Sequence, residues 1–109
     1  MVLKRIEELL DAPESGSAAP SLARMEAILT DGYAQALALE AERSRIERRI
    51  GEVATTAEDR VDGLAAELAA LASRKRTAEG ELKRLRSLLG RLNDRARAAR
   101  RQTIPDLTA

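Results

Sequence analysis

Aromatic residues are almost absent from this chain. Tyr33 is its one aromatic residue, and the chain has no Phe and no Trp. Compact domains draw much of their buried area from aromatic side chains. Here leucine, isoleucine, valine and alanine must supply that area, and a chain rich in Ala, Leu, Glu and Arg is typical of long helices. The composition therefore favours thin seams between helices.

Cysteine and histidine are both missing. Without cysteine the chain forms no disulfide and supports no thiolate chemistry. Without histidine it lacks the commonest general base and the commonest transition-metal ligand. The sequence also contains no glycine-rich phosphate-binding motif and no nucleophile elbow. We expect no catalytic residue, no cofactor and no metal site, so the chain is not predicted to be an enzyme.

Long apolar runs are absent as well. No stretch approaches the roughly 18 uninterrupted apolar residues of a membrane-spanning helix. Acidic residues such as Glu7 and Glu8 stand where a signal peptide needs its apolar segment. We therefore expect no membrane span and a cytoplasmic location.

A repeat of apolar residues at alternating spacings of three and four is the main feature that is present. Such a repeat places the side chains along one seam of a helix, where they meet a partner helix. It runs from Leu22 to Ala99 and changes phase near Thr55 and Thr56. The pattern predicts an all-α fold, an antiparallel two-helix coiled-coil hairpin.

Stop and start signals for helices occur together near the phase break. Gly51 fits the residue after a helix end, and Thr55 and Thr56 each have an acid three residues later, the spacing of a capping box. The alternative is one continuous helix in which the phase break is a four-residue stutter. The favoured division is a short amphipathic helix at 1–12, a Pro/Gly/Ser linker at 13–20, a helical hairpin at 21–101 (helices at about 21–50 and 56–101, turn at about 51–55) and a flexible tail at 102–109.

Reversal of the chain near residue 53 sets an expected register in which Gly32 lies opposite Lys75. It also places two alanine-rich stretches, 34–41 and 64–72, side by side. Because they are apolar nearly all round, we expect them to bury against a second copy, giving a homodimer with a four-helix bundle. The alternative is that these alanines are solvent-exposed, since Ala is the best helix former. The expected interface comprises Ala36, Leu37, Leu39, Ala41, Leu64, Leu68 and Leu71.

The end of the second long helix extends beyond the first in this register. The N-terminal segment, with Leu3, Ile6 and Leu10 on one face, is expected to cover it; the alternatives are a disordered N-terminus and docking onto another copy by exchange. Its acids Glu7, Glu8 and Asp11 would then meet Arg91, Arg95 and Arg97.

Charge is divided unevenly along the chain. The net charge is +1, but residues 74–101 carry eleven basic and three acidic residues. The favoured interpretation is a solvated helix whose charge is balanced by acids of the first long helix and of the N-terminal segment. The alternatives are binding of nucleic acid, since clustered arginines bind phosphate although no aromatic side chain is present there for base stacking, and binding of an acidic protein. The basic patch comprises Arg84, Arg86, Arg91, Arg95, Arg97, Arg100 and Arg101.

Two functions follow from these patterns. The favoured one is a non-enzymatic coiled-coil oligomerisation, adaptor or chaperone-like module that binds another protein. The alternative is a basic helical protein that binds nucleic acid non-specifically through 74–101.

Overall fold

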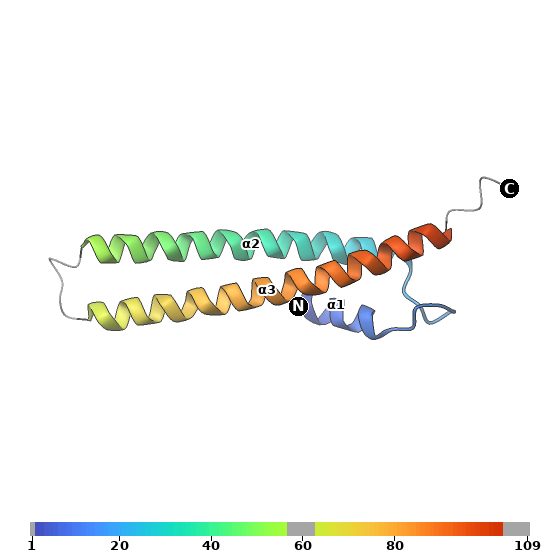
Figure 1. The fold of residues 1–109 in the computed structure, drawn as a ribbon, viewed down its shortest axis with the longest axis horizontal. Helices are drawn as coiled ribbons and strands as arrows, with labels where there is room; N and C mark the ends of the chain where they lie inside the picture. Colours follow the sequence, from blue (N-terminus) through green and yellow to red (C-terminus); the bar gives the residue numbers. More distant parts are fainter. Residues whose placement is uncertain (1, 57–62, 104–109) are drawn as a thin grey trace. The chain divides into compact units, whose positions relative to one another are not determined.

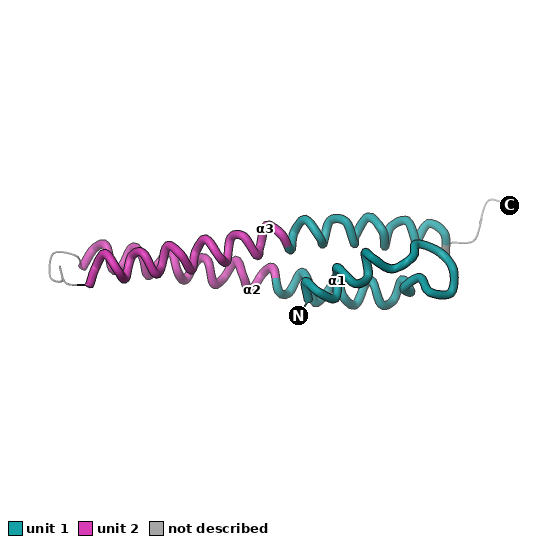
Figure 2. The backbone as a smooth tube through the Cα atoms, turned by 90° about the horizontal axis from the view of Figure 1, so that it is seen from below, with its two compact units in different colours: residues 1–35, 85–109 teal, residues 36–84 magenta. Residues whose placement is uncertain are grey.

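The structure is a computed structural model that describes residues 2–56 and 63–103. These residues form three α-helices and no strand: α1 (Val2–Asp11), α2 (Leu22–Thr55) and α3 (Leu64–Thr103) (Figure 1). The all-α fold and the helical hairpin, with a short N-terminal helix, are confirmed. The chain divides into two compact units, unit 1 (residues 1–35 and 85–109) and unit 2 (residues 36–84) (Figure 2).

Helix α1 is a short amphipathic helix of unit 1. Ile6 and Leu9, three residues apart, are its buried side chains, while Lys4, Arg5 and Glu8 are exposed. Ten residues are too few for a stable isolated helix in water, because nucleation is costly. The helix therefore depends on burial against the rest of unit 1.

A linker of ten residues, 12–21, joins α1 to α2. Gly16 has a φ of 91°, the left-handed conformation that side chains beyond glycine rarely adopt. The N–H of Ala19 donates to the Gly16 carbonyl at 3.2 Å, which closes a turn. Ser21 then caps α2, because its Oγ accepts a hydrogen bond from the N–H of Arg24 at 3.1 Å.

The core of unit 1 is shared by three helices. Gly32 in α2 lies against Leu89 in α3 and Ile6 in α1, so the three backbones approach one another at this point. The buried apolar side chains of the unit are Ile6, Leu9, Met25, Ile28, Leu29, Leu85, Leu88, Leu89, Leu92 and Ala96.

The core of unit 2 is a seam between two helices. Ile46 and Val53 of α2 pack with Leu71 of α3, and Ile50, Leu64 and Leu68 are partly buried around them. Along this seam α2 and α3 run antiparallel, since Arg49 pairs with Glu67 at 3.1 Å while Glu42, earlier in α2, pairs with Arg74 at 3.7 Å. Among the described residues of the unit, Ala36, Leu39, Ala78 and Leu82 are the other buried side chains.

Residues 51–55, where the sequence indicated a turn, are the last part of α2. Gly51 lies inside this helix, where a glycine costs only about 1 kcal/mol of stability relative to alanine. Burial of the Val53 side chain offsets that cost. The hydroxyls of Thr55 and Thr56 donate back to the Glu52 carbonyl at 2.9 and 3.1 Å. They therefore satisfy carbonyls at the end of α2 instead of capping the start of α3. Glu58 and Asp59, their expected capping partners, lie outside the described residues.

The register of the hairpin also differs from the expected one. Gly32 meets Leu89 instead of Lys75, and the Nζ of Lys75 lies 3.5 Å from the Oε1 of Glu47. The pairing is thus displaced by about four helical turns along α3. The cause is the later reversal of the chain, since α2 continues to Thr55 and α3 begins only at Leu64.

The contact between the two alanine-rich stretches was expected from the incorrect register, and it does not occur. The start of α3, from Leu64 to Leu71, packs against α2 between Ile46 and Val53. Leu39, in the other alanine-rich stretch, lines a small cleft with Ala78. Each stretch packs against a more polar segment of the opposite helix.

Candidate functional site

Within residues 2–56 and 63–103, no group of three or more acidic or other metal-binding side chains is placed to hold a metal ion. None of the helices in these ranges has the length and apolar character that crossing a bilayer requires.

In unit 1, the guanidinium of Arg95 binds four main-chain carbonyl oxygens. From α3, its Nη1 donates to the carbonyl oxygens of Leu9 at 2.6 Å and Leu10 at 3.0 Å. Its Nη2 donates to the carbonyls of Ala12, at 2.6 Å, and Pro13. The guanidinium thus binds the C-terminal end of α1, where the last carbonyls of a helix lack partners within the helix.

This arrangement corrects the expected partner of Arg95. The sequence placed the acids of α1 against it, but it binds main-chain carbonyls. Helix α1 has no basic residue in its last turn, so a cation from another helix fills that place and interacts favourably with the negative end of the helix dipole. The sequence did contain a signal for such a contact. The short N-terminal helix has no basic residue in its last turn and no glycine after it, so its last carbonyls needed a donor from another helix.

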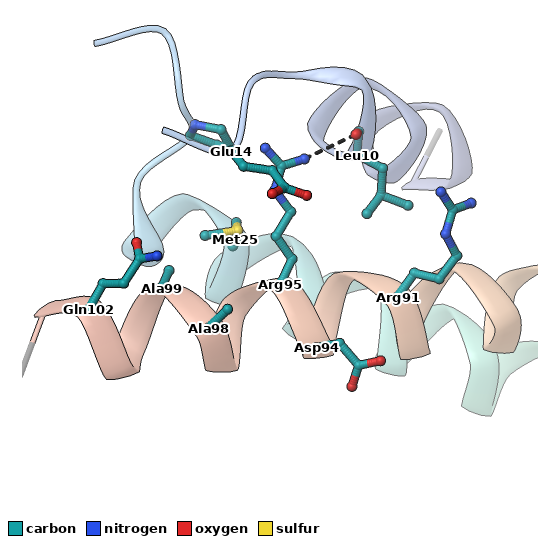
Figure 3. A pocket seen from close by; sticks show the side chains of 10 residues that line it. Leu10, Glu14, Met25, Arg91, Asp94, Arg95, Ala98, Ala99 and Gln102 are labelled. Atoms are coloured by element: carbon teal, nitrogen blue, oxygen red, sulfur yellow. Dashed lines mark hydrogen bonds between the residues drawn. The ribbon is translucent and has the colours of Figure 1, made fainter. Parts of the chain in front are cut away.

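A cleft of about 390 Å³ surrounds Arg95 in unit 1 (Figure 3). Its walls combine apolar side chains, including Leu10 and Met25, with charges of both signs, including Glu14 and Arg91. Figure 3 shows the Arg95 guanidinium turned towards the end of α1, with a hydrogen bond to the Leu10 carbonyl. The mixed charges give the cleft no preference for an anion or a cation, and its best-positioned donor already binds the main chain.

The seven residues of the basic patch are divided between the two units. Arg84 belongs to unit 2 and the other six belong to unit 1. Arg95 binds carbonyls, and the Nη2 of Arg100 lies 2.8 Å from the Oε1 of Glu26. Elsewhere in the basic segment, Arg74 pairs with Glu42 and Lys75 with Glu47. Acids of α2 therefore balance part of the basic charge of α3.

The seven residues of the expected interface all lie in unit 2 but have different environments. Ala36, Leu39 and Leu71 are buried in the seam between α2 and α3, and Leu64 and Leu68 are partly buried beside it. Only Leu37 and Ala41 are exposed. The seam thus uses most of the residues that the sequence assigned to a dimer.

Leu37 is the most exposed large apolar side chain among the described residues. Its exposed fraction is 67%. It lies on the side of α2 opposite the buried residues Leu39 and Ile46, and the neighbouring Ala38 and Ala41 are exposed too. In unit 1, Tyr33 is 49% exposed.

No family model, no curated protein and no solved structure matches this chain.

Proposed function

We propose that this chain is a non-enzymatic protein-interaction module that self-associates through the outer face of α2 in unit 2, formed by Leu37, Ala38 and Ala41. The carrying observation is the 67% exposure of Leu37 on a helix whose other large aliphatic side chains, in unit 2, pack inward. Burying a leucine that is otherwise exposed contributes about 1.5–3 kcal/mol. The flanking alanines are small, so a second helix can approach this face closely.

The architecture of unit 2 supports the same proposal. Its core is a single seam between two helices, and small cores of this kind are stabilised by oligomerisation in many proteins. A second copy packed against the outer face of α2 would add the burial that a two-helix unit lacks. The partner is therefore another copy of this chain, with the homodimer as the expected assembly.

Nucleic-acid binding through 74–101 is less favoured. Arg74, Lys75 and Arg100 form ion pairs with acids of α2, and Arg95 binds carbonyl oxygens. Each of these contacts would have to be given up before a phosphate could take its place.

Light scattering after size-exclusion chromatography, over a wide range of protein concentration, tests the proposal. The native chain is expected to dimerise, and Leu37→Asp to remain helical by circular dichroism but become monomeric. Ala69→Asp is the matched control, because Ala69 is an exposed residue of α3 in the same unit. It is expected to stay dimeric.

Two outcomes would contradict the proposal. A native chain that remains monomeric at high concentration would exclude self-association. Dissociation by Ala69→Asp but not by Leu37→Asp would place the contact on α3 instead of the outer face of α2.

A further inference from the structure

We propose that α1 is an exchangeable helix: the groove of unit 1 that holds it accepts the α1 of a second copy through the same contacts. The inference rests on the self-association proposed above, and it adds a reciprocal contact in which each copy supplies Ile6 and Leu9 to the other. Three features of unit 1 support it: the dependence of α1 on docking, the location of its anchors and the nature of its linker.

Helix α1 is built to dock. Its two buried side chains, Ile6 and Leu9, are 0% and 4% exposed, so nearly all their apolar surface is covered. Ten residues do not hold a helix in water by themselves. Whichever copy supplies the groove therefore also supplies most of the stability of α1.

Three anchors of α1 belong to α2 and α3. Ile6 lies beside Gly32 of α2, which Leu89 of α3 also approaches. The Nη2 of Arg5 lies 3.4 Å from the Oδ2 of Asp31.

The third anchor is Arg95, which binds the carbonyl oxygens at the end of α1 and just after it. Residues 14–21 supply none of these anchors. A groove on another copy would therefore offer α1 the same partners, which is the condition under which exchange of an identical element costs little.

The linker is what keeps α1 on its own chain. Its ten residues span up to about 35 Å when extended, and the left-handed turn at Gly16 shortens that reach. A short flexible tether gives an effective concentration in the millimolar range. A second copy competes with that concentration only when it is already held nearby, as in the homodimer proposed above.

Cysteine cross-linking measures the exchange directly, because the native chain has no cysteine. The variant with both Arg5→Cys and Asp31→Cys carries one thiol on each side of the ion pair between α1 and α2, and both side chains are about half exposed. A short bis-maleimide should link them. A link within one chain gives a monomer on a denaturing gel, whereas exchange gives a covalent dimer.

Exchange predicts a covalent dimer from the double variant, and also from an equal mixture of the two single variants. Arg5→Cys mixed with Arg101→Cys is the matched control, because Arg101 is also exposed in unit 1. It lies about 18 Å along α3 from Leu89, which approaches Gly32 beside Ile6. This pair should not cross-link above background.

Opening the turn at Gly16 should raise the exchanged fraction. Gly16→Val places a β-branched residue at a φ of 91°. Strain of this kind disfavours the closed linker by about tenfold, which corresponds to ~1.4 kcal/mol. The ratio of covalent dimer to cross-linked monomer should increase by a similar factor.

The outcomes separate this inference from the proposed function. A covalent dimer that disappears when Leu37→Asp is added supports both. A chain that dimerises by light scattering but cross-links only within one chain overturns the exchange and leaves the proposed function intact. A chain that is monomeric and cross-links only internally overturns both.

Two further results test either the exchange or the dimer contact separately. A covalent dimer that persists with Leu37→Asp supports the exchange and overturns the outer face of α2 as the dimer contact. Equal cross-linking of the Arg5→Cys and Arg101→Cys control pair would overturn the exchange, since the dimer would then form without α1 in its groove.

Discussion

Gly32 of α2 lies so close to Leu89 of α3 that a Cβ atom added to the glycine would stand 2.4 Å from the Cδ2 of Leu89. No Cβ atom tolerates that separation, so either the leucine or the helix must move. Leu89 is 3% exposed and has little room to do so. The glycine therefore determines how closely α2 and α3 approach in unit 1.

Gly32→Ala is expected to destabilise the chain by about 1 kcal/mol. Overpacking a core costs ~1–3 kcal/mol, and the better helix propensity of alanine returns up to ~1 kcal/mol. Gly90→Ala is the matched control, because an added Cβ there has nothing within 4 Å. It should stabilise the chain by about 0.5–1 kcal/mol.

Urea denaturation followed by circular dichroism at a fixed protein concentration measures both changes. Equal stabilisation by the two substitutions would show that α2 and α3 do not meet at Gly32 and Leu89.

The helices themselves could be predicted from the sequence, but their pairing could not. Alternating spacings of three and four place Leu85, Leu89 and Leu92 on one face whichever helix covers them, and these residues are indeed buried. The same regularity lets one helix slide along the other while apolar residues still face apolar residues. The register depends on the length of the reversal and on the fit between Gly32 and Leu89, and neither appears in a periodic pattern.

The role of Arg95 was hidden for a different reason. The sequence analysis paired charged side chains of opposite sign, and it therefore predicted that Glu7, Glu8 and Asp11 contact the arginines of α3. The partners of Arg95 include the main-chain carbonyl oxygens of Leu9 and Leu10. Every residue has such a carbonyl, so the side-chain sequence does not identify these partners. The contact depends on the position of the C-terminal end of α1 relative to Arg95 in the folded chain.

Arg95→Ala is expected to loosen α1 while leaving the rest of unit 1 folded. Hydrogen bonds to a charged group contribute about 1.5–3 kcal/mol. Loss of ~2 kcal/mol from the opening free energy of α1 would accelerate amide hydrogen exchange in α1 by about 30-fold. Mass spectrometry of peptides covering residues 2–11 measures this rate.

Two variants make that measurement specific. Arg95→Lys should recover part of the protection, since an ammonium donates to fewer carbonyls than a guanidinium. Arg97→Ala removes an exposed arginine two residues away and should leave α1 unchanged. Unaltered exchange in Arg95→Ala would mean that burial of Ile6 and Leu9 alone holds the helix.

Leu39→Asp should impair folding of unit 2, whereas Leu37→Asp should impair only dimerisation. Leu39 is 6% exposed and Leu37 is 67% exposed. An unpaired carboxylate in the seam of unit 2 would cost several kcal/mol, so Leu39→Asp should lose helical signal from this unit. Leu37→Asp should change monomer stability by less than about 1 kcal/mol.

Thermal denaturation at low protein concentration separates the two effects. If Leu37→Asp melts as early as Leu39→Asp, then Leu37 contributes to the fold of the single chain, and the outer face of α2 is not a surface available to a partner.

Binding to DNA should be weak and only shallowly dependent on salt. If all seven arginines of the basic patch met phosphates, log affinity would fall with log salt with a slope of about −6. Arg95 and Arg100 have partners within unit 1. With these two arginines engaged, we expect a slope of about −4.5 or shallower, measured by fluorescence anisotropy with a labelled duplex over a range of salt concentrations.

Glu26→Gln supplies the control for that measurement. Removing the carboxylate that lies 2.8 Å from Arg100 makes this arginine more available to phosphate, so the slope should steepen by about 1. Tight binding by the native chain with a slope near −6 would instead show that phosphates displace these intramolecular contacts. Because giving up the hydrogen bonds of Arg95 would also loosen α1, such binding should be accompanied by faster amide exchange in residues 2–11, and the basic surface of α3 would then be the functional one.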